Sequence, residues 1–214
     1  MLPLAADDWL QTQPSEASVK VFDSGMPEEA YWNSLFDIQQ IVKWLKVGDV
    51  VDPIVEIGCG YGTFTVPVAK EYDGIVHAFD IEATMVERAR NNARRAGIQN
   101  VTFHLRDILM QGTGLASQSI GMVLLFNILH SFDKHMMLSE ASRILKKSGI
   151  VAIIHWRKDI DTPRGPSLES RPDKATILDS VDDLDLLFKG NSRILEPYHW
   201  GIQLVKGDKR KESP

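Results

Sequence analysis

Residues 54–63 read Ile-Val-Glu-Ile-Gly-Cys-Gly-Tyr-Gly-Thr, an apolar run followed by three glycines at alternate positions. The apolar run predicts a short buried strand, and the glycines predict a tight turn where a ligand can approach the backbone beside a helix N-terminus. The dinucleotide-binding pattern G-x-G-x-x-G would need a glycine where Thr63 stands, and the phosphate-binding pattern G-x-x-x-x-G-K-[ST] would need a lysine that this loop lacks. The stretch therefore predicts a ligand-binding loop of another kind.

Strand and helix patterns alternate on either side of this loop. Besides 54–57, strands are predicted at 74–80, 101–105, 120–128, 150–156, 192–196 and 200–206, the last two forming a hairpin around Pro197. Helices are predicted over 27–48, from Thr63 onward, and over 82–96, 133–146 and 177–188. Strands that alternate with helices form βαβ units, so the sequence predicts an α/β protein whose mostly parallel sheet is covered on both faces.

The composition is that of an ordinary globular domain, with 214 residues, 43% hydrophobic and 25% charged. A formal net charge of −5 disfavours a dedicated nucleic-acid binder. No apolar run approaches the roughly 20 residues that span a bilayer, so no membrane partner is expected. The single cysteine, Cys59, excludes an internal disulfide framework and a Cys-rich zinc module. The first eight residues lack a basic region and turn acidic, which predicts a cytoplasmic protein without a secretory signal.

Three parts are expected along the chain: an N-terminal arm and cap helix over 1–48, a core over 49–206, and a polar tail over 207–214. The core contains a loop at about 157–172 that is rich in proline, glycine and charge. This loop is longer than the usual connection of about 4–6 residues, and its prolines stiffen it. It is therefore predicted to be a defined lid.

Two acidic residues follow strands next to the glycine loop. Asp80 closes the second strand 18 residues after Gly62, where a carboxylate can accept hydrogen bonds from ribose hydroxyls. Asp107 follows the third strand and is well placed to meet the edge of a nucleobase. The alternative is that both residues only cap helices or turns.

With these features in place, the sequence resembles the class I S-adenosylmethionine-dependent methyltransferases. The residues that carry the resemblance are the loop at 55–63, Asp80-Ile81, Arg-Asp-Ile at 106–108, Asn-Ile-Leu-His at 127–130 and Arg-Ile-Leu-Lys-Lys-Ser-Gly-Ile at 143–150. It covers about residues 30–206 in order. It implies a Rossmann-like, doubly wound, mostly parallel seven-stranded sheet with a reversed last strand.

The resemblance also implies a cofactor, S-adenosyl-L-methionine, which is converted to S-adenosyl-L-homocysteine. In the family the glycine loop packs against the methionine part, the acidic residue after strand two binds the ribose, and the Asp after strand three meets the adenine. The residues expected to bind the cofactor are Glu56, Gly58, Cys59, Gly60, Gly62, Thr63, Asp80, Ile81, Asp107, Ile108 and Asn127. Cys59 is expected to be a small loop residue and not a nucleophile, because nothing nearby marks an activating base.

The acceptor pocket is expected beyond the carboxyl ends of the strands. The family's topology would make the doublets His155-Trp156 and His199-Trp200 neighbours there. Either histidine is a candidate general base, since a neutral hydroxyl, amine or carbon acid must lose a proton, whereas a thiolate or carboxylate acceptor would need no base. The alternative is that both histidines are simply hydrogen-bonded at the sheet edge. No metal site is predicted.

Arginines of the lid loop could clamp a carboxylate or phosphate of the acceptor, or could instead pair with the loop's own acidic residues. The tryptophans could form apolar or π walls for an aromatic acceptor. The substrate-binding candidates are Tyr31, Trp32, His130, Trp156, Arg157, Arg164, Arg171, Tyr198 and Trp200.

The sequence thus favours a methyltransferase that acts on a small molecule, with an aromatic or anionic acceptor. The alternatives are an RNA or protein methyltransferase and a non-catalytic S-adenosylmethionine-binding protein. Enzymes that methylate base amino groups typically carry Asn-Pro-Pro-aromatic after strand four, which residues 127–130 do not match. A nicotinamide-dependent oxidoreductase is disfavoured by Thr63. The sequence leaves the acceptor, the methylated atom and the oligomeric state open.

Overall fold

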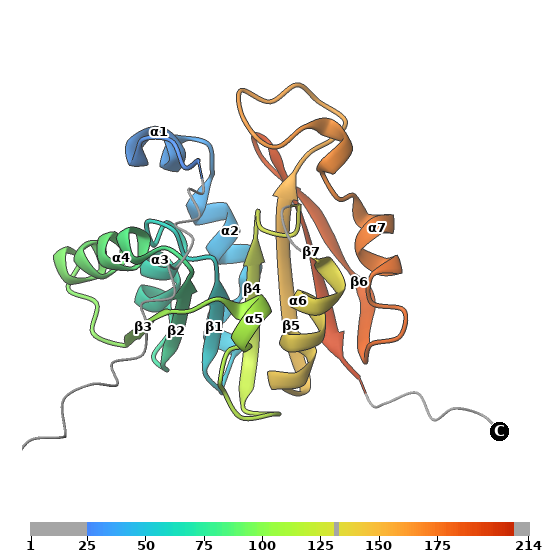
Figure 1. The fold of residues 1–214 in the computed structure, drawn as a ribbon, viewed down its shortest axis with the longest axis horizontal. Helices are drawn as coiled ribbons and strands as arrows, with labels where there is room; N and C mark the ends of the chain where they lie inside the picture. The colour runs from blue at the N-terminus through green and yellow to red at the C-terminus, as the bar shows by residue number, and fades with distance from the viewer. Residues whose placement is uncertain (1–24, 131–132, 208–214) are drawn as a thin grey trace, which may run out of the picture.

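The computed structural model describes residues 25–130 and 133–207, so residues 1–24 of the predicted N-terminal part and residues 208–214 of the predicted tail lie outside the described residues. Its centre is a seven-stranded sheet of order β3-β2-β1-β4-β5-β7-β6, in which β7 runs antiparallel to both of its neighbours (Figure 1). The strands are β1 Ile54–Ile57, β2 Val76–Asp80, β3 Val101–Leu105, β4 Ile120–Phe126, β5 Leu145–Trp156, β6 Leu186–Leu195 and β7 His199–Lys206. The predicted doubly wound fold with a reversed last strand is confirmed.

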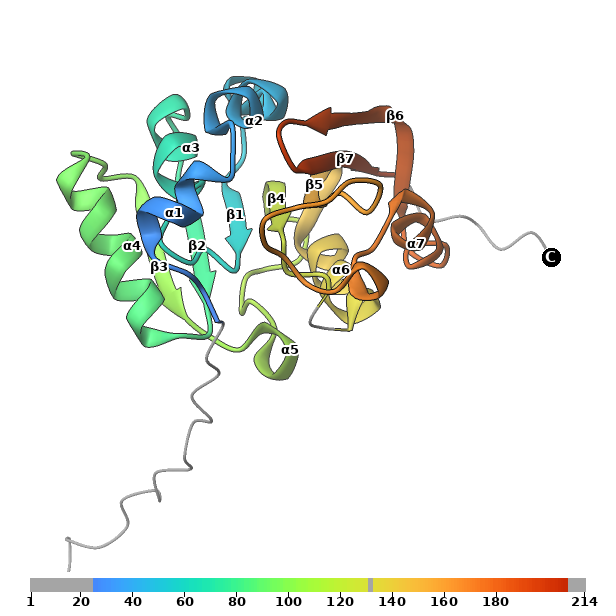
Figure 2. The same cartoon turned by 90° about the horizontal axis from the view of Figure 1, so that it is seen from above.

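Helices cover both faces of the sheet (Figure 2). They are α1 Glu29–Ser34, α2 Ile38–Leu45, α3 Thr65–Glu71, α4 Ala83–Arg95, α5 Ile108–Gln111, α6 Lys134–Ile144 and α7 Lys174–Asp179, with 3-10 turns at Val47–Asp49 and Leu168–Ser170. Successive strand residues face opposite sides. In β5, Val151 and Ile153 pack in the core that includes α6 and α7, whereas Ala152 and Ile154 pack in the core that includes α2 and α3.

The N-terminal helix predicted over 27–48 is in fact two helices. Asp37 caps α2 by accepting a hydrogen bond from the Gln40 backbone N–H at 2.9 Å. Between the helices, Phe36 forms an isolated bridge with Pro197 in the turn between β6 and β7. The cap and the bridge end the first helix, and they fasten this segment to the far end of the chain.

The predicted helix over 177–188 is wrong for every residue after Asp179. Helix α7 ends at Asp179, and β6 begins at Leu186 and runs through Gly190. Leu186 and Phe188 pair with Lys206 and Leu204 of β7, so these apolar residues at a spacing of two belong to a strand.

Two smaller predictions also need correction. The helix over 133–146 ends at Ile144, because β5 begins at Leu145 and pairs there with Ile120 of β4. The short helix α5 was not predicted, and its four residues follow directly after Asp107, which caps it. The first difference lies at the boundary of an element, and the second is a short element that the sequence pattern did not indicate.

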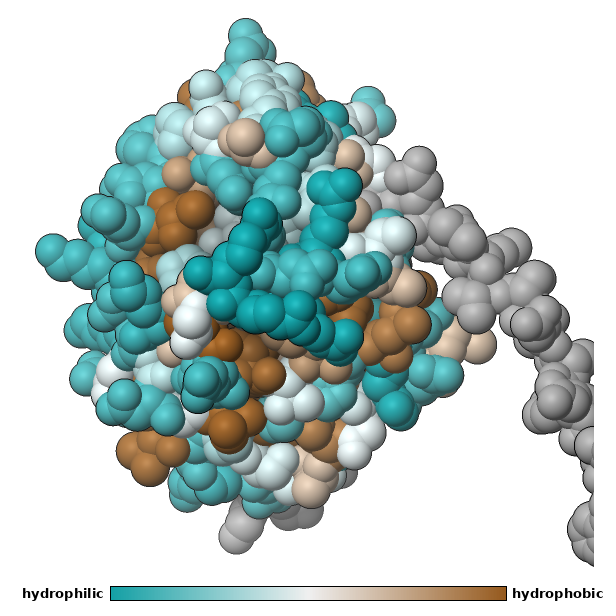
Figure 3. Space-filling view, turned by 90° about the vertical axis from the view of Figure 1, so that its left-hand side faces the viewer, coloured by the Kyte–Doolittle hydropathy of each residue, from teal (hydrophilic) through white to brown (hydrophobic). Residues whose placement is uncertain are grey.

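The carboxyl ends of β1, β2, β4 and β5 meet at the upper edge of the sheet in Figure 1, where the α1 segment and the loop after β5 also lie. The surface seen from the side of α4 and β3 is mainly hydrophilic, with small apolar patches (Figure 3). No helix within residues 25–130 and 133–207 is long and apolar enough to cross a membrane. In open α/β sheets, ligands bind beyond the carboxyl ends of the strands, so a site is expected at this upper edge.

Candidate active site

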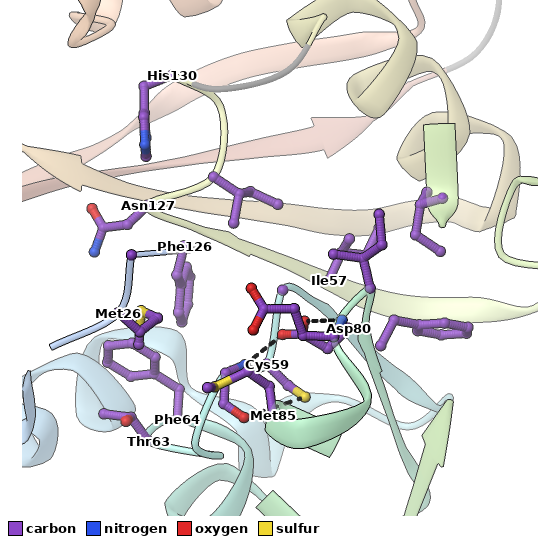
Figure 4. A pocket seen from close by; sticks show the side chains of 18 of the residues that line it. Met26, Ile57, Cys59, Thr63, Phe64, Asp80, Met85, Phe126, Asn127 and His130 are labelled. Atoms are coloured by element: carbon purple, nitrogen blue, oxygen red, sulfur yellow. Dashed lines mark hydrogen bonds between the residues drawn. The ribbon is translucent and has the colours of Figure 1, made fainter. Parts of the chain in front are cut away.

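A cavity of about 570 Å³ lies at the carboxyl edge of the sheet (Figure 4). Its size lies within the range of small-molecule sites, roughly 300–1,000 Å³. Thirteen of the residues expected from the sequence line it: Trp32, Gly58, Cys59, Gly60, Thr63, Asp80, Ile81, Asp107, Ile108, Asn127, His130, Trp156 and Arg164. Residues that the sequence did not single out line it as well, among them Met26, Phe64, Met85, Phe126, Gly165 and Pro166.

The glycine loop owes its course to backbone conformations that other residues rarely adopt. Gly58 has φ +80°, and a Cβ atom there would lie 2.6 Å from Cγ2 of Ile128. Gly60 has φ +52° and donates its N–H to Oδ2 of Asp80 at 2.8 Å. The loop therefore exposes its backbone to the cavity without side chains. We call this stretch the glycine cradle, because a side chain here would occupy the space that a ligand needs.

Asp80 ends β2 with both carboxylate oxygens facing backbone donors. Oδ2 accepts from Gly60, and Oδ1 accepts from the Glu82 N–H at 3.0 Å. Burial raises the pKa of Asp80, while these backbone hydrogen bonds oppose the rise. Each oxygen of an ionised carboxylate has a second lone pair, so Asp80 can hold the loop in place and still accept from a ligand hydroxyl.

Asp107 has the same double character. Its Oδ1 accepts from the backbone N–H groups of Leu109 at 3.0 Å and Met110 at 3.1 Å, so it caps α5, and the residue also lines the cavity. The sequence left capping and ligand binding as alternatives for both aspartates. In the structure the two roles are compatible.

Glu56 lies within β1, behind the glycine loop, and does not line the cavity. Its Oε2 accepts a hydrogen bond from the Thr65 hydroxyl, and its Oε1 has no partner among the described residues. Burial raises its pKa to about 8. Gly62 also lies off the cavity wall, where a Cβ atom would meet Ala89 at 3.3 Å, so both residues support the loop from behind.

Asn127 follows β4 and lines the cavity with a side-chain amide that forms no hydrogen bond among the described residues. It has φ +56°, and its backbone N–H donates to the carbonyl oxygen of Ile154 at 2.8 Å. The side chain is buried, and neither its Oδ1 nor its Nδ2 has a partner in the part of the chain that the structure describes. A buried amide without partners costs about 1–3 kcal/mol for each unsatisfied group, so this side chain fits a ligand.

The two candidate general bases do not line the cavity. The register pairs His155 with Trp200 and Trp156 with His199, which confirms that the two doublets are neighbours. His199 is fully buried, with its ring centroid 4.3 Å from that of Phe36 and 4.2 Å from that of Trp156. Neither of its nitrogens has a partner within the described ranges, and burial lowers its pKa to about 3.

The imidazole that lines the cavity is that of His130, in the loop after β4 (Figure 4). Its Nδ1 lies 3.2 Å from Nε2 of His155, which is fully buried behind it. The sequence analysis predicted His130 only as a substrate contact. Its position directly after a strand, at the carboxyl edge of the sheet, was the feature that could have made it a candidate for a catalytic role.

The three lid arginines differ in what they touch. Arg164 lines the cavity and donates to the carbonyl oxygen of Gly25, so it joins the lid loop to the N-terminal segment. Arg157 pairs with Asp159 at 2.9 Å, and Arg171 is buried within the loop. Arg157 therefore follows the alternative of pairing with an acidic residue of the loop, and it also pairs with Glu196 outside the loop at 3.6 Å. Arg171 holds the loop from within.

Arg171 is held by three acceptors. It donates to the carbonyl oxygens of Pro166 at 2.9 Å and Arg157 at 2.6 Å, and to the Thr162 hydroxyl at 2.8 Å. Of the aromatic candidates, Trp32 and Trp156 line the cavity with ring centroids 6.3 Å apart. Tyr31, Tyr198 and Trp200 do not line it.

Comparison with known proteins gives this architecture a family. The sequence profile described as "Methyltransferase domain" matches residues 50–189, and the chain belongs to this family. The structure is similar to a SAM-dependent methyltransferase from Aquifex aeolicus, with a TM-score of 0.71 and 20% identity over 84% of this chain and 94% of that one. It is also similar to magnesium protoporphyrin IX methyltransferase from Synechocystis PCC 6803 with bound S-adenosylhomocysteine, with a TM-score of 0.64 and 18% identity over 79% and 81% of the two chains.

A curated relative comes from RNA methylation. The 23S rRNA (uracil(1939)-C(5))-methyltransferase RlmD of Aeromonas hydrophila is 36% identical over 90 residues, which is 41% of this chain and 20% of RlmD. The match thus spans about a fifth of that relative's length. The protein is a class I S-adenosylmethionine-dependent methyltransferase, and its cofactor is S-adenosylmethionine. The bare glycine cradle, Asp80 and the Asn127 amide, which has no partner among the described residues, fit this cofactor.

Proposed function

We propose that this protein transfers the methyl group of S-adenosylmethionine to a small-molecule acceptor. The observation that carries this proposal is the composition of the cavity wall. The glycine loop lines this cavity, and so do Trp32, Trp156 and residues 164–166 of the lid loop. A chain that covers its own acceptor end with a lid and two tryptophans suits an acceptor of limited size.

In this proposal the cofactor's ribose hydroxyls are held by Asp80 and its adenine by the segment at Asp107 and Ile108. The glycine loop and the Asn127 amide face the amino-acid part. When bound, S-adenosylmethionine supplies an already activated methyl group, so the chain needs no strong electrophile of its own. The chain's own residues align the acceptor behind the methyl group and exclude water.

The similarity to RlmD favours RNA methylation as a second candidate function. Carbon 5 of uracil becomes nucleophilic enough only after a nucleophile, such as a thiolate, has added to carbon 6. The single cysteine of this chain, Cys59, is 3% exposed, and burial and the Asp80 carboxylate raise its pKa well above the ordinary value. Cys59 is therefore poorly suited to that chemistry, and the small-molecule candidate is preferred.

The test is transfer of labelled methyl from S-adenosylmethionine into a cell extract that is then separated into small-molecule, RNA, DNA and protein fractions. We expect label in the small-molecule fraction, lost with Asp80→Ala and kept with Glu71→Ala, an exposed residue at the end of α3. Label in the RNA fraction would favour the second candidate. Tight S-adenosylhomocysteine binding without label in any fraction would point to a non-catalytic binder.

A further inference from the structure

The two ends of the cavity differ in charge. Three carboxylates and one cation line the end proposed for the adenosine: Asp80 ends β2, Glu82 follows it, and Arg106 and Asp107 follow β3. Beyond the Asn127 amide, which is proposed for the amino-acid part of the cofactor, the polar residues that follow β4 and β5 at the acceptor end are His130 and Arg164. Among the described residues that line the acceptor end there is no carboxylate, so this end offers hydrogen-bond donors and a cation.

The hydrogen bonds behind His130 determine which of its nitrogens carries the proton. The backbone N–H of Trp156 donates to Nδ1 of His155 at 3.0 Å, so that nitrogen cannot itself carry a proton. A neutral imidazole has one proton, and His155 therefore carries it on Nε2, which lies 3.2 Å from Nδ1 of His130. His155 donates to His130, and the proton of His130 is left on its Nε2.

The surroundings keep both rings neutral. Burial lowers the pKa of His130, and the cations Lys134 of α6 and Arg171 of the lid loop lower it further. Burial holds the pKa of His155 well below its ordinary value, with His130, His199 and the same two cations acting in the same direction. At neutral pH the pair therefore presents a single N–H donor, with no basic nitrogen left free on His130.

We propose that His130 is a hydrogen-bond donor to the acceptor and not a general base, that His155 is its positioning residue, and that the acceptor is a carboxylate. This inference rests on the proposed function of the same site. Hydroxyls, amines and carbon acids must lose a proton on methylation, and the acceptor end holds no group free to take one. Of the acceptors that need no base, a thiol with an ordinary pKa of about 8.5 is mostly protonated at neutral pH, whereas a carboxylate is already ionised and matches the donors His130 and Arg164.

The reaction balances without a base. A carboxylate oxygen forms the bond to the methyl carbon, and the carbon–sulfur bond of the sulfonium breaks with its electron pair remaining on sulfur. The products are a methyl ester and a neutral thioether, and no proton is transferred. His130 and Arg164 hold the carboxylate in line, and Trp32 and Trp156 contact its apolar part.

Nuclear magnetic resonance tests the donor assignment without any turnover. Long-range ¹H–¹⁵N correlation spectra of the full chain saturated with S-adenosylhomocysteine distinguish the two neutral tautomers of each histidine and the protonated ring. The His130 signals are assigned by their loss in His130→Gln. At pH 7 we expect a neutral ring with its proton on Nε2. A proton on Nδ1, or a doubly protonated ring, would overturn the proposal.

Paired substitutions separate a donor from a base in the labelled-methyl assay. The amide nitrogen of His130→Gln can still donate from about the position of Nε2, but it cannot take a proton, whereas His130→Ala can do neither. We expect the Gln variant to keep activity within about fivefold of wild type and the Ala variant to lose about tenfold or more, one hydrogen bond to a charged group being worth roughly 1.5–3 kcal/mol. Equal loss in both variants would overturn the assignment of His130 as a donor.

His155 is tested through its effect on His130. His155→Gln keeps a donor toward Nδ1 of His130, and His155→Phe removes it at similar volume. In the Phe variant we expect the spectra to show His130 with its proton distributed between Nδ1 and Nε2. We also expect KM for the acceptor to rise more than kcat falls. The Gln variant should restore the single tautomer and the wild-type KM. His135→Gln, at a surface pair with Asp183, is the matched control. An unchanged His130 tautomer in His155→Phe would remove His155 from the proposal.

The carboxylate is tested by the chemistry of the product. Mild alkali hydrolyses a methyl ester and releases volatile methanol, whereas methyl groups on nitrogen, carbon or an ether oxygen stay bound. We expect most of the label in the small-molecule fraction to become volatile. Label that survives alkali would overturn the carboxylate assignment. Label in RNA, or none at all, would instead count against the proposed function, and the spectra would still decide the role of His130.

Discussion

At the scale of single residues, Glu56 is a buried carboxyl whose ionisation the fold opposes. Burial raises its pKa from 4.5 to about 8, because the hydrogen bond from Thr65 offsets only part of the desolvation. Between these two values the unfolded chain gives up the proton and the folded chain keeps it. The contribution of Glu56 to stability is therefore complete below pH 4.5 and is lost as the pH rises through about 8.

We expect Glu56→Gln to keep the hydrogen bond from Thr65 and to lose this pH dependence. Between pH 5 and pH 9, the free energy of unfolding of the wild type should fall by on the order of 3 kcal/mol relative to the variant. Urea unfolding at both pH values, without cofactor, measures the difference. Curves that stay parallel across this range would contradict the account of Glu56.

His199 gives the opposite dependence. Its pKa falls from 6.5 to about 3 on folding, so its contribution is present above pH 6.5 and is lost as the pH drops toward 3. Because its ring packs between Phe36 and Trp156 with both nitrogens unsatisfied among the described residues, we expect His199→Phe to stabilise the fold by about 1–3 kcal/mol. Thermal unfolding should show the gain growing with acidity, at unchanged methyl transfer. A lower melting temperature would count against this.

The cofactor end of the site could be predicted from the sequence, whereas the choice of imidazole could not. Asp80, Asp107 and Asn127 follow strand ends, and parallel strands bring their carboxyl ends to one edge whatever the details of packing. His155 and Trp156 are adjacent in a strand and therefore face opposite sides. Which of them lines the cavity depends on the helices that pack on each face, and the sequence alone leaves that open.

At the scale of elements, the glycine loop is where backbone geometry and binding meet. Gly58→Ala would place a Cβ atom against Ile128 at positive φ, so we expect S-adenosylhomocysteine affinity to fall by about tenfold or more. Gly97→Ala is the matched control, since Gly97 also has positive φ, +72°, but meets nothing within 4 Å and lies off the cavity wall. Calorimetric titration should find its affinity near wild type. Equal losses in the two variants would indicate strain alone.

The lid loop depends on Arg171, whose guanidinium fork holds three acceptors within the loop. We expect Arg171→Ala to loosen residues 157–172 and to speed thermolysin cleavage beside Leu168, which is 49% exposed. Arg171→Lys should not rescue the loop, because an ammonium cannot reproduce the fork.

Asp159→Ala is the control for the lid, because the Asp159 side chain that pairs with Arg157 is 67% exposed and screened by solvent. Its cleavage rate should stay near that of the wild type. A rate in Arg171→Ala no higher than in Asp159→Ala would show that the loop does not depend on the buried guanidinium.

Element order could be read from the sequence because apolar periodicity changes between strands and helices, but the boundaries could not. The break between α1 and α2 needs the Asp37 cap and the bridge from Phe36 to Pro197, a contact across most of the chain. Leu186 and Phe188 fit a helical spacing with earlier residues and also a strand spacing with each other. Pairing with β7 decides between these patterns, and pairing is a property of the fold.

At the scale of the whole molecule, one sheet edge collects both halves of the proposed reaction. The strands β1 to β3 contribute the cofactor end, and β4 and β5 contribute the acceptor end (Figure 1). Arg164 joins the lid loop to the N-terminal segment through its hydrogen bond to Gly25. The central claim is that a single cavity binds S-adenosylmethionine and a small acceptor together.

The most direct test is mass spectrometry of a small-molecule extract incubated with the protein and S-adenosylmethionine that carries a deuterated methyl group. The account predicts a carboxylic acid converted to its deuterated methyl ester, formed with the wild type and with Glu71→Ala and absent with Asp80→Ala. Deuterated methyl found only in RNA, while the small-molecule extract stays unchanged, would contradict it.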